Sequence, residues 1–321
     1  MLNRKQRVKI GNVFSGEIEV TSGIPQGSVI GPLLFQLYIN DLPSSITSEI
    51  RLFADDCIIY RRVPGINDRE ILQKDLYQLD KWTKSNGMVI NVSKSKHIAF
   101  SRKKLKDTNQ YTMNGEPIPV VSHCKYLGVN LSDNLKWDRH IEELTLRAYR
   151  NLHFAMRNLK RSGKGVKIQA YKSLVRPIAE YATNAWDPHE NGLIKKLEGI
   201  QRKAARYVTG KHRREDSVGE MLGALQWESL ESRRRLNRLA GIFKAWNGEE
   251  SWNELSVRLN GPNYIGHGSH KLKIKEREHK TDLGKYSFIN RGIRDWNALP
   301  GELLMPMPKN VKQFKSRIKV P

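Results

Sequence analysis

Two adjacent aspartates, Asp55 and Asp56, interrupt an apolar stretch that runs from Leu52 to Tyr60. β-Branched and aromatic residues favour a half-buried strand, whereas aspartate fits poorly inside one. We therefore predict two short strands joined by a hairpin whose tip is Ala54 to Asp56. Carboxylates at such a tip suit Mg²⁺, which takes oxygen ligands and usually combines one or two carboxylates with water and substrate phosphates. The alternative is an ordinary polar turn with two solvated acids.

The charge balance indicates the class of partner. The chain has 321 residues, enough for two domains, and carries 56 Lys and Arg against 33 Asp and Glu, a net charge of +23. Residues 1–130 hold 18 basic and 12 acidic residues, and residues 131–321 hold 38 and 21. This excess indicates a polyanionic partner such as nucleic acid, and its concentration in the second part favours binding of phosphate backbone there.

The two cysteines, Cys57 and Cys124, lie far apart and outside any CxxC pair, so neither a disulfide scaffold nor a cysteine zinc site is supported. We therefore expect a reducing, intracellular compartment. No apolar stretch is long enough for a spanning helix, and no apolar run follows the charged N-terminus, so neither a secretory signal nor a membrane partner is expected. The chain also begins with basic and β-branched residues that lead directly into a strand pattern at Glu17 to Val20. We therefore expect that sequence upstream of Met1 is missing.

The first part of the chain alternates loop, helix and strand patterns. The glycine and proline content of residues 21–27 is typical of a loop, and residues 28–39 are predicted as a helix in which Gly31 and Pro32 form a first turn or a kink. A second amphipathic helix is predicted before a stop at Gly87, from the apolar spacing of Leu72, Leu76, Leu79 and Trp82.

Residues 97–100 and 118–131 are predicted as strands, separated by a basic loop at 101–106 and a turn at Asn114 and Gly115. Together these patterns indicate an α+β fold in which helices cover one face of a mostly antiparallel sheet.

Beyond Trp137 strand patterns largely vanish. One helical stripe is formed by Ile141, Leu144, Ala148, Leu152, Ala155 and Leu159, and another by Leu193, Leu197, Ile200, Ala204 and Val208. The second helix carries basic residues on its other faces, namely Lys195, Lys196, Arg202, Lys203 and Arg206. They could lie along a nucleic-acid backbone, and the alternative is a solvated basic face.

Further helices are expected in the remainder of the chain. Residues 168–181 are predicted to be helical with a kink at Pro177, and residues 221–246 to form one long helix or a broken pair. Glycine, histidine and lysine dominate residues 260–284, which predicts a mobile linker before a short terminal piece around Trp296 and Phe314.

Several short strings occur in a characteristic order: SGIPQGSVIGPLLFQLYINDLP at Ser22 to Pro43, LFADDCIIYR at Leu52 to Arg61, NVSK at Asn91 to Lys94 and YLGV at Tyr126 to Val129. With LVRPIAEYA at Leu174 to Ala182 and WNALP at Trp296 to Pro300, the chain resembles the C-terminal part of the reverse transcriptase of non-LTR retrotransposons, especially jockey-like elements. The resemblance implies a right-hand polymerase palm, truncated at its N-terminus, at residues 1–131. A helical thumb and connection at 132–255, and a flexible linker with a short extension at 256–321, would follow.

The family likeness also implies an activity and its partners. The activity would be RNA-directed DNA polymerisation, with an RNA template, a DNA primer, deoxynucleoside triphosphates and two Mg²⁺ ions, and the location would be nuclear. By likeness Asp55 bridges the metals, and Asp56 supports the site or binds more weakly. The resemblance assigns nucleotide or template binding to Pro25, Gln26, Gly27, Ser28, Phe53, Ala54 and Lys94, and bracing of the primer end to Tyr126, Leu127 and Gly128.

Residue by residue, each motif also has a plainer explanation. Pro25 to Ser28 could be a helix entry, Lys94 an exposed lysine, and Tyr126 to Gly128 a strand with a glycine bend. The sequence also departs from the family, because no aspartate occurs from Met1 to Asn40, where another metal-binding aspartate is expected; Glu17 and Glu19 are the acids there. We therefore expect the chain to be inactive alone. The alternative function is that of a catalytically silent remnant that binds RNA or DNA through its basic thumb.

Overall fold

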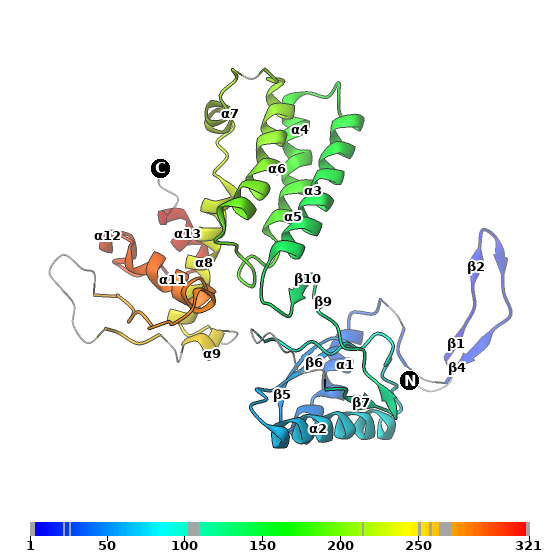
Figure 1. The fold of residues 1–321 in the computed structure, drawn as a ribbon. Helices are drawn as coiled ribbons and strands as arrows, with labels where there is room; N and C mark the ends of the chain where they lie inside the picture. The colour runs from blue at the N-terminus through cyan, green and yellow to red at the C-terminus, as the bar shows by residue number, and fades with distance from the viewer. Residues whose placement is uncertain are drawn as a thin grey trace. The chain divides into compact units, whose positions relative to one another are not determined.

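The computed structural model describes residues 4–21, 23–25, 27–101, 109–213, 215–249, 252–256, 259–262 and 271–318 (Figure 1). The chain divides into two compact units, Met1–Ala99 with Lys106–Val121 and Phe100–Leu105 with Ser122–Pro321. The hairpin at residues 123–132 therefore belongs to the second unit, whereas the family resemblance places the boundary between palm and thumb after residue 131. Helices and antiparallel hairpins coexist in the chain, which confirms the α+β class.

The core of the first unit is built on helix α2, Ile66–Ser85. The predicted stripe lies on its inner side, in one apolar cluster with Ile50, Leu52 and Ile59 of strands β5, Glu49–Phe53, and β6, Asp56–Tyr60. The helix ends at Ser85 and is capped by Asn86, and Gly87 follows with φ of +64°, a conformation that glycine adopts without strain. The hairpin β7, Thr112–Met113, and β8, Glu116–Pro117, turns at Asn114 and Gly115, as expected.

The N-terminal segment forms a ribbon of short strands that projects from the rest of its unit (Figure 1). Strand β1, Arg4–Gln6, pairs with β4, Ile18–Val20, and β2, Lys9–Ile10, pairs with β3, Val13–Phe14. After the loop, helix α1 covers Gly31–Ile39 with Pro32 in its first turn, followed by a 3₁₀ turn at Leu42–Ser45. The pair Gly31 and Pro32 is thus a helix start rather than a kink.

The strands of the described residues form five separate two-stranded ladders rather than the continuous sheet that the sequence patterns indicated. The predicted strand at 97–100 is reduced to one parallel bridge between His97 and Val120. In that bridge the His97 N–H donates to the Pro119 carbonyl and the Val121 N–H donates to the His97 carbonyl, and the pairing ends there because from His123 the chain pairs with β10 instead. Only β9, His123–Tyr126, and β10, Val129–Ser132, form within the expected strand at 118–131.

In the second unit, α3, Asp138–Asn158, packs against α6, Asn191–Thr209, and the helices around them run side by side (Figure 1). The two predicted stripes are buried in this core, apart from Leu159, which is half-buried. Between them α4, Lys164–Ala170, continues through a π-helical segment at Tyr171–Val175 into α5, Arg176–Glu180. The irregular turn directly precedes Pro177, as expected of a residue that cannot donate to the preceding turn.

A second apolar core in this unit surrounds α8, Leu230–Trp246, which α7, Val218–Ala224, precedes as a separate helix. Most of the core residues come from α8, from α11, Phe288–Asn297, from α12, Gly301–Leu304, and from α13, Val311–Ile318. Trp296 and Phe314 are fully buried here. Short helices α9, Asn253–Ser256, and α10, Asp282–Lys285, complete the described part.

The predicted linker at 260–284 lies partly outside the described residues, which resume at residue 271. In its described part Ile274 is buried in the second core, and its backbone N–H donates to the side chain of Asn297 at 2.9 Å. The terminal piece predicted around Trp296 and Phe314 is therefore a packed group of helices built on α8.

Candidate functional site

The aspartate pair lies at the tip of the β5–β6 hairpin, as the sequence predicted. The register pairs Phe53 with Asp56, which leaves Ala54 and Asp55 as a two-residue turn. Ala54 has φ of +50°, in the left-handed region that residues with a Cβ rarely adopt. All four residues are exposed. The two carboxylates are therefore not equivalent, because Asp55 belongs to the turn and Asp56 to the strand.

The alternation of the strands determines which face of the hairpin Asp56 occupies. Residues opposite one another in the ladder share a face, so Ile50 and Ile59 form the inner face, which packs onto α2. By the same alternation, the pair Phe53 and Asp56 lies on the outer face. Among the described residues no lysine, arginine or histidine forms an ion pair with Asp55 or Asp56.

A neighbouring carboxylate shows the contrasting, structural use of an acid in this unit. Asp75 on α2 is buried and accepts hydrogen bonds from the backbone N–H groups of Thr47 at 2.9 Å and Ser48 at 2.8 Å. Both of its oxygens are thereby used, and they fix the segment that leads into β5. Asp75 thus fixes the base of the β5–β6 hairpin, whereas Asp55 and Asp56 at the tip of the hairpin are exposed to solvent.

The chemistry of the tip fits a hard divalent cation only in part. Two exposed carboxylates without basic partners offer the oxygen donors that Mg²⁺ takes, which are commonly one or two carboxylates plus water and phosphate oxygens. In the part of the chain that the structure describes, no group of three or more His, Cys, Asp or Glu is gathered as a metal site. Asp55 and Asp56 can therefore supply part of a metal site, to which substrate phosphates or other carboxylates would have to contribute.

The loop before α1 forms a tight turn, in which the backbone N–H of Ser28 donates to the carbonyl of Pro25 at 3.2 Å. Gly27 has φ of +81° and open space where a Cβ would be, and Pro25 is exposed. Gln26 lies outside the described residues. In the same unit, Lys94 is exposed within a turn that the side chain of Asn91 closes by accepting from the Lys94 N–H at 3.1 Å.

None of the hydrogen bonds or ion pairs within the described ranges joins these turns to Asp55 or Asp56. The roles assigned to Pro25, Gly27, Ser28 and Lys94 therefore stay predictions.

The Tyr126 to Gly128 motif forms the turn between β9 and β10. Leu127 has φ of +44° and Gly128 of +81°, and positive φ at both central residues defines the type I′ turn typical of two-residue hairpins. The hydroxyl of Tyr181, which follows α5, donates to the carbonyl of Leu127 at 2.9 Å. Sequence reasoning missed this brace, since nothing in the spacing connects residues 54 positions apart.

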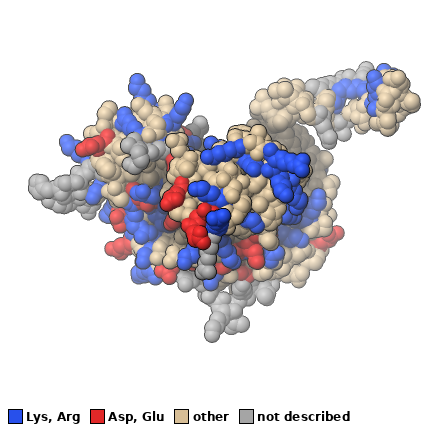
Figure 2. Space-filling model, turned by 90° about the horizontal axis from the view of Figure 1, so that it is seen from above, with Lys and Arg blue, Asp and Glu red and all other residues tan. Residues whose placement is uncertain are grey.

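On α6 four of the five predicted basic residues are exposed, and the fifth, Arg206, is half-buried. The Arg202 guanidinium donates to the carbonyl of Lys195 at 3.0 Å, and Arg206 donates to the carbonyl of Arg213 at 3.1 Å. The Lys203 ammonium lies 5.5 Å from the centre of the Tyr149 ring. None of the five forms an ion pair with a described carboxylate. Lys and Arg also gather into patches on the face of the molecule seen from above (Figure 2).

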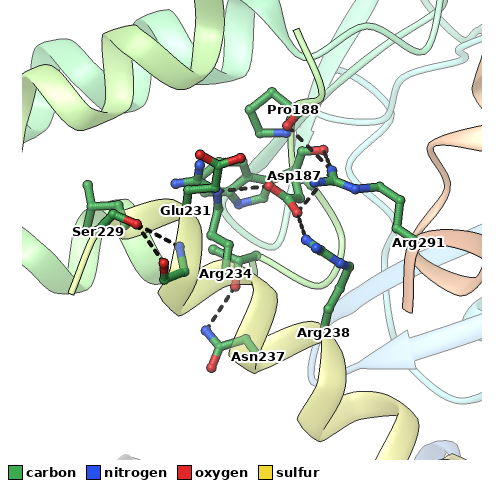
Figure 3. A network of polar contacts seen from close by, with 12 residues as sticks. Asp187, Pro188, Ser229, Glu231, Arg234, Asn237, Arg238 and Arg291 are labelled. Carbon is green, nitrogen blue, oxygen red and sulfur yellow. Dashed lines mark hydrogen bonds and ion pairs between the residues drawn. The ribbon is translucent and has the colours of Figure 1, made fainter. Parts of the chain in front are cut away.

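A buried ion network, also missed from the sequence, ties the segment before α6 to α8 and α11 (Figure 3). Asp187 accepts hydrogen bonds from Arg234 at 2.9 Å and from Arg238, and forms an ion pair with Arg291 at 3.1 Å. Arg238 also binds Asp295 of α11. Because Arg234 and Arg238 are almost fully buried, this network is structural, and it fixes the second apolar core to the first.

Comparison with known proteins identifies the chain's relatives. Residues 2–131 match the family described as "Reverse transcriptase (RNA-dependent DNA polymerase)". The "Probable RNA-directed DNA polymerase from transposon X-element" of Drosophila melanogaster is 31% identical over 216 residues, which are 64% of this chain and 24% of that protein. The "RNA-directed DNA polymerase from mobile element jockey" of Drosophila funebris is 29% identical over 205 residues, covering 60% of this chain and 22% of that protein.

The "Probable RNA-directed DNA polymerase from transposon BS" of Drosophila melanogaster is 26% identical over 220 residues, again 64% of this chain and 24% of that protein. The chain thus spans about a quarter of the length of the relatives it matches.

None of the helices in the described ranges combines the length and apolar character needed to cross a membrane.

Proposed function

We propose that the chain is part of an RNA-directed DNA polymerase, because residues 2–131 match the reverse transcriptase family and the chain is similar to the polymerases of transposon X-element and mobile element jockey. Within that enzyme Asp55 and Asp56 contribute to the metal centre. The observation that carries this proposal is the exposed tip of the β5–β6 hairpin, which holds two carboxylates without basic partners inside the matched region: Asp55 in the turn and Asp56 at the start of the strand. A merely structural acid would be used as Asp75 is, with both oxygens bonded to backbone.

The proposed chemistry is attack of a primer 3′ hydroxyl on a deoxynucleoside triphosphate, with pyrophosphate as leaving group. Divalent metal ions, commonly Mg²⁺ in reverse transcriptases, would activate the hydroxyl and neutralise charge on the phosphates. Asp55 in the turn and Asp56 on the strand would hold these ions unequally, as their positions in the hairpin suggest. Lys94 would stabilise charge on the triphosphate.

The remaining assignments complete the proposal. The turn at Pro25 to Ser28, together with Phe53 and Ala54, would border the nucleotide and template, and Tyr126 to Gly128 would brace the primer end. Residues 1–131 would be a partial palm, 132–255 a helical thumb and connection, and 256–321 a linker and extension. An RNA template and a DNA primer would be the partners, and the nucleus the place of action.

Primer extension on an RNA template tests the metal centre. We expect the purified chain alone to extend no primer with Mg²⁺, and a longer protein with the upstream coding sequence in frame to do so. In the longer protein, Asp55→Asn should lower the rate about 100-fold or more, since losing a metal ligand removes several kcal/mol of transition-state stabilisation.

Glu70→Gln, at an exposed carboxylate on α2, is the matched control and should leave the rate unchanged. If the short chain extends the primer robustly and Asp55→Asn abolishes this extension, the expected inactivity of the chain is refuted. Extension by the longer protein that tolerates Asp55→Asn would refute the site.

The second candidate function, catalytically silent nucleic-acid binding, is favoured by the basic residues of α6, none of which is neutralised by a described carboxylate. Each lysine or arginine bound to phosphate releases counterions, so the logarithm of the binding constant falls by about 0.7 to 0.9 per contact for each tenfold rise in salt.

We expect the double variant Lys196→Gln/Lys203→Gln to weaken binding and to reduce that slope by about two contacts. The charge-matched variant Lys309→Gln/Lys312→Gln, at exposed positions outside α6, should change neither quantity as much. If the unmodified chain binds nucleic acid weakly and this binding does not depend on salt, binding through phosphate contacts is excluded.

A further inference from the structure

A cleft of about 180 Å³ lies in the second unit between the β9–β10 hairpin and α3. Lys125, Gly128 and Asn130 line it from the hairpin, and α3 contributes Arg147, Arg150 and other residues. The cleft therefore borders the Leu127–Gly128 turn, but its basic side chains belong to none of the motifs identified in the sequence.

The charges that line the cleft are mostly uncompensated. Lys125, Arg147 and Arg150 are exposed, and within the described ranges none of them forms an ion pair with a carboxylate. The acid of the cleft, Glu143, is already engaged: it accepts from the Asn130 side chain at 2.8 Å and from Arg139 at 3.2 Å. These hydrogen bonds and the nearby Lys125 lower the pKa of Glu143. Glu143 therefore stays ionised and is paired with Arg139.

The wall of the cleft is held in place by a buried histidine. The Nδ1 atom of His140 accepts from the backbone N–H of Asn130 at 3.2 Å, so the proton of the neutral ring is on Nε2. Nε2 is buried, and no partner for it occurs among the described residues. Burial, with Arg147 nearby, lowers the pKa of His140 to about 4, so the ring is neutral near pH 7. The hairpin is thus fixed to α3 without adding a negative group to the cleft.

We propose that this cleft binds one phosphate group, held by Lys125, Arg147 and Arg150. Three cationic side chains converge from two elements on a space large enough for a phosphate, and guanidinium groups match phosphate oxygens in geometry as well as in charge. Its position beside the Leu127–Gly128 turn makes a nucleic-acid backbone the source of that phosphate. This source rests on the proposed function; the phosphate site itself does not.

Inorganic phosphate is the first probe, and the amide signal of Gly128 in the glycine-labelled full chain is the readout. We expect phosphate to shift this signal saturably, while sodium chloride at equal ionic strength leaves it in place. The double variant Arg147→Gln/Arg150→Gln should weaken phosphate binding about tenfold or more, since charge-assisted hydrogen bonds are lost. Arg157→Gln, at an exposed arginine of the same helix outside the cleft, should leave it unchanged.

Glutamine retains helix propensity close to that of arginine, so the double variant should fold, which a circular dichroism melt verifies. A shift that chloride reproduces, or that survives in the double variant, overturns the phosphate site. A short single-stranded DNA should displace inorganic phosphate from the cleft. If the DNA binds but phosphate still shifts Gly128, the cleft takes free phosphate and the backbone source is wrong. Failure of primer extension alone would affect only the proposed function.

Discussion

The hydroxyl of Tyr181 donates a hydrogen bond to the carbonyl oxygen of Leu127 at 2.9 Å, so the residue that follows α5 fixes the turn between β9 and β10. The same ring lies 3.1 Å from the position that a Cβ on Gly128 would occupy. The turn is therefore held by its own type I′ geometry and by an aromatic ring packed against its glycine. The motifs at Tyr126 to Val129 and Leu174 to Ala182, which are far apart in the sequence, are therefore in direct contact.

Gly128→Ala should destabilise the second unit for two reasons. Its φ of +81° is unfavourable for alanine, and the new methyl would meet the Tyr181 ring. Gly115→Ala is a matched control, because Gly115 also turns a two-residue hairpin, with φ of +78°, but has open space around its Cβ position. We expect a loss of about 1 kcal/mol for Gly115→Ala and of about 2 to 3 kcal/mol for Gly128→Ala, measured by thermal unfolding. Equal losses would show that the ring contact is unimportant.

Ala54→Gly should stabilise the hairpin that holds the two aspartates. The left-handed conformation of Ala54 costs alanine about 1 to 2 kcal/mol, whereas the added flexibility of glycine in the unfolded chain costs about 0.5 to 1 kcal/mol. We expect a net gain of about 0.5 to 1 kcal/mol, seen as slower amide hydrogen exchange in β5 and β6. Ala298→Gly, at an exposed alanine with φ of −84°, should instead destabilise its own surroundings. Faster exchange in the Ala54→Gly hairpin would show that the methyl group makes a favourable contact.

Local patterns in the sequence were sufficient for the features that depend on neighbouring residues. The α2 stripe, the β5–β6 tip and the Asn114–Gly115 turn were all predicted, because each follows from spacing or from turn chemistry within a few residues. The predicted continuous sheet does not form among the described residues, where each strand is short and pairs with one neighbour only, because joining such pairs depends on contacts between segments that local patterns do not encode. The contacts of Asp187, Tyr181 and His140 join distant segments, for which one sequence offers no periodic signal.

The buried His140 should make stability depend on pH. Its pKa is about 4 in the folded chain, because of burial first and then Arg147, with Lys125 acting in the same direction and Glu143 opposing them. In the unfolded chain it is about 6.5, so the unfolded state binds the proton more tightly and stability falls as pH drops below about 6.5 towards 4. Between pH 7 and pH 5 this group should account for a loss of about 2 kcal/mol.

Replacing the histidine tests this origin. His140→Asn should lower stability at pH 7, because the acceptor for the Asn130 N–H is disturbed, but should flatten the dependence on pH between 7 and 5. Thermal unfolding at both pH values in both proteins gives the comparison. His153→Asn, at a half-buried histidine of the same helix, is the control and should retain most of the dependence. An unchanged slope in His140→Asn would mean that other groups titrate in this range.

Asp187→Asn should be among the most destabilising single changes in the second unit. It removes the carboxylate that Arg234, Arg238 and Arg291 share, and the side chain of Arg234 is only 1% exposed, so water cannot replace the lost partner. Breaking a buried ion pair by neutralising one partner costs about 3 to 5 kcal/mol. Thermal unfolding should therefore show a large drop in the free energy of unfolding, whereas Asp295→Asn should cost less, because the Asp295 side chain is 21% exposed.

The double variant Asp187→Asn/Arg234→Met separates the unpaired charge from other effects. Removing the buried guanidinium together with its partner should recover part of the lost stability, because the unfavourable burial of a lone cation is gone. Recovery would locate the cost in the unpaired charge of Arg234. Strictly additive losses would show instead that Asp187 acts mainly by packing, and that the ion network contributes little to fixing α8 and α11 to the segment before α6.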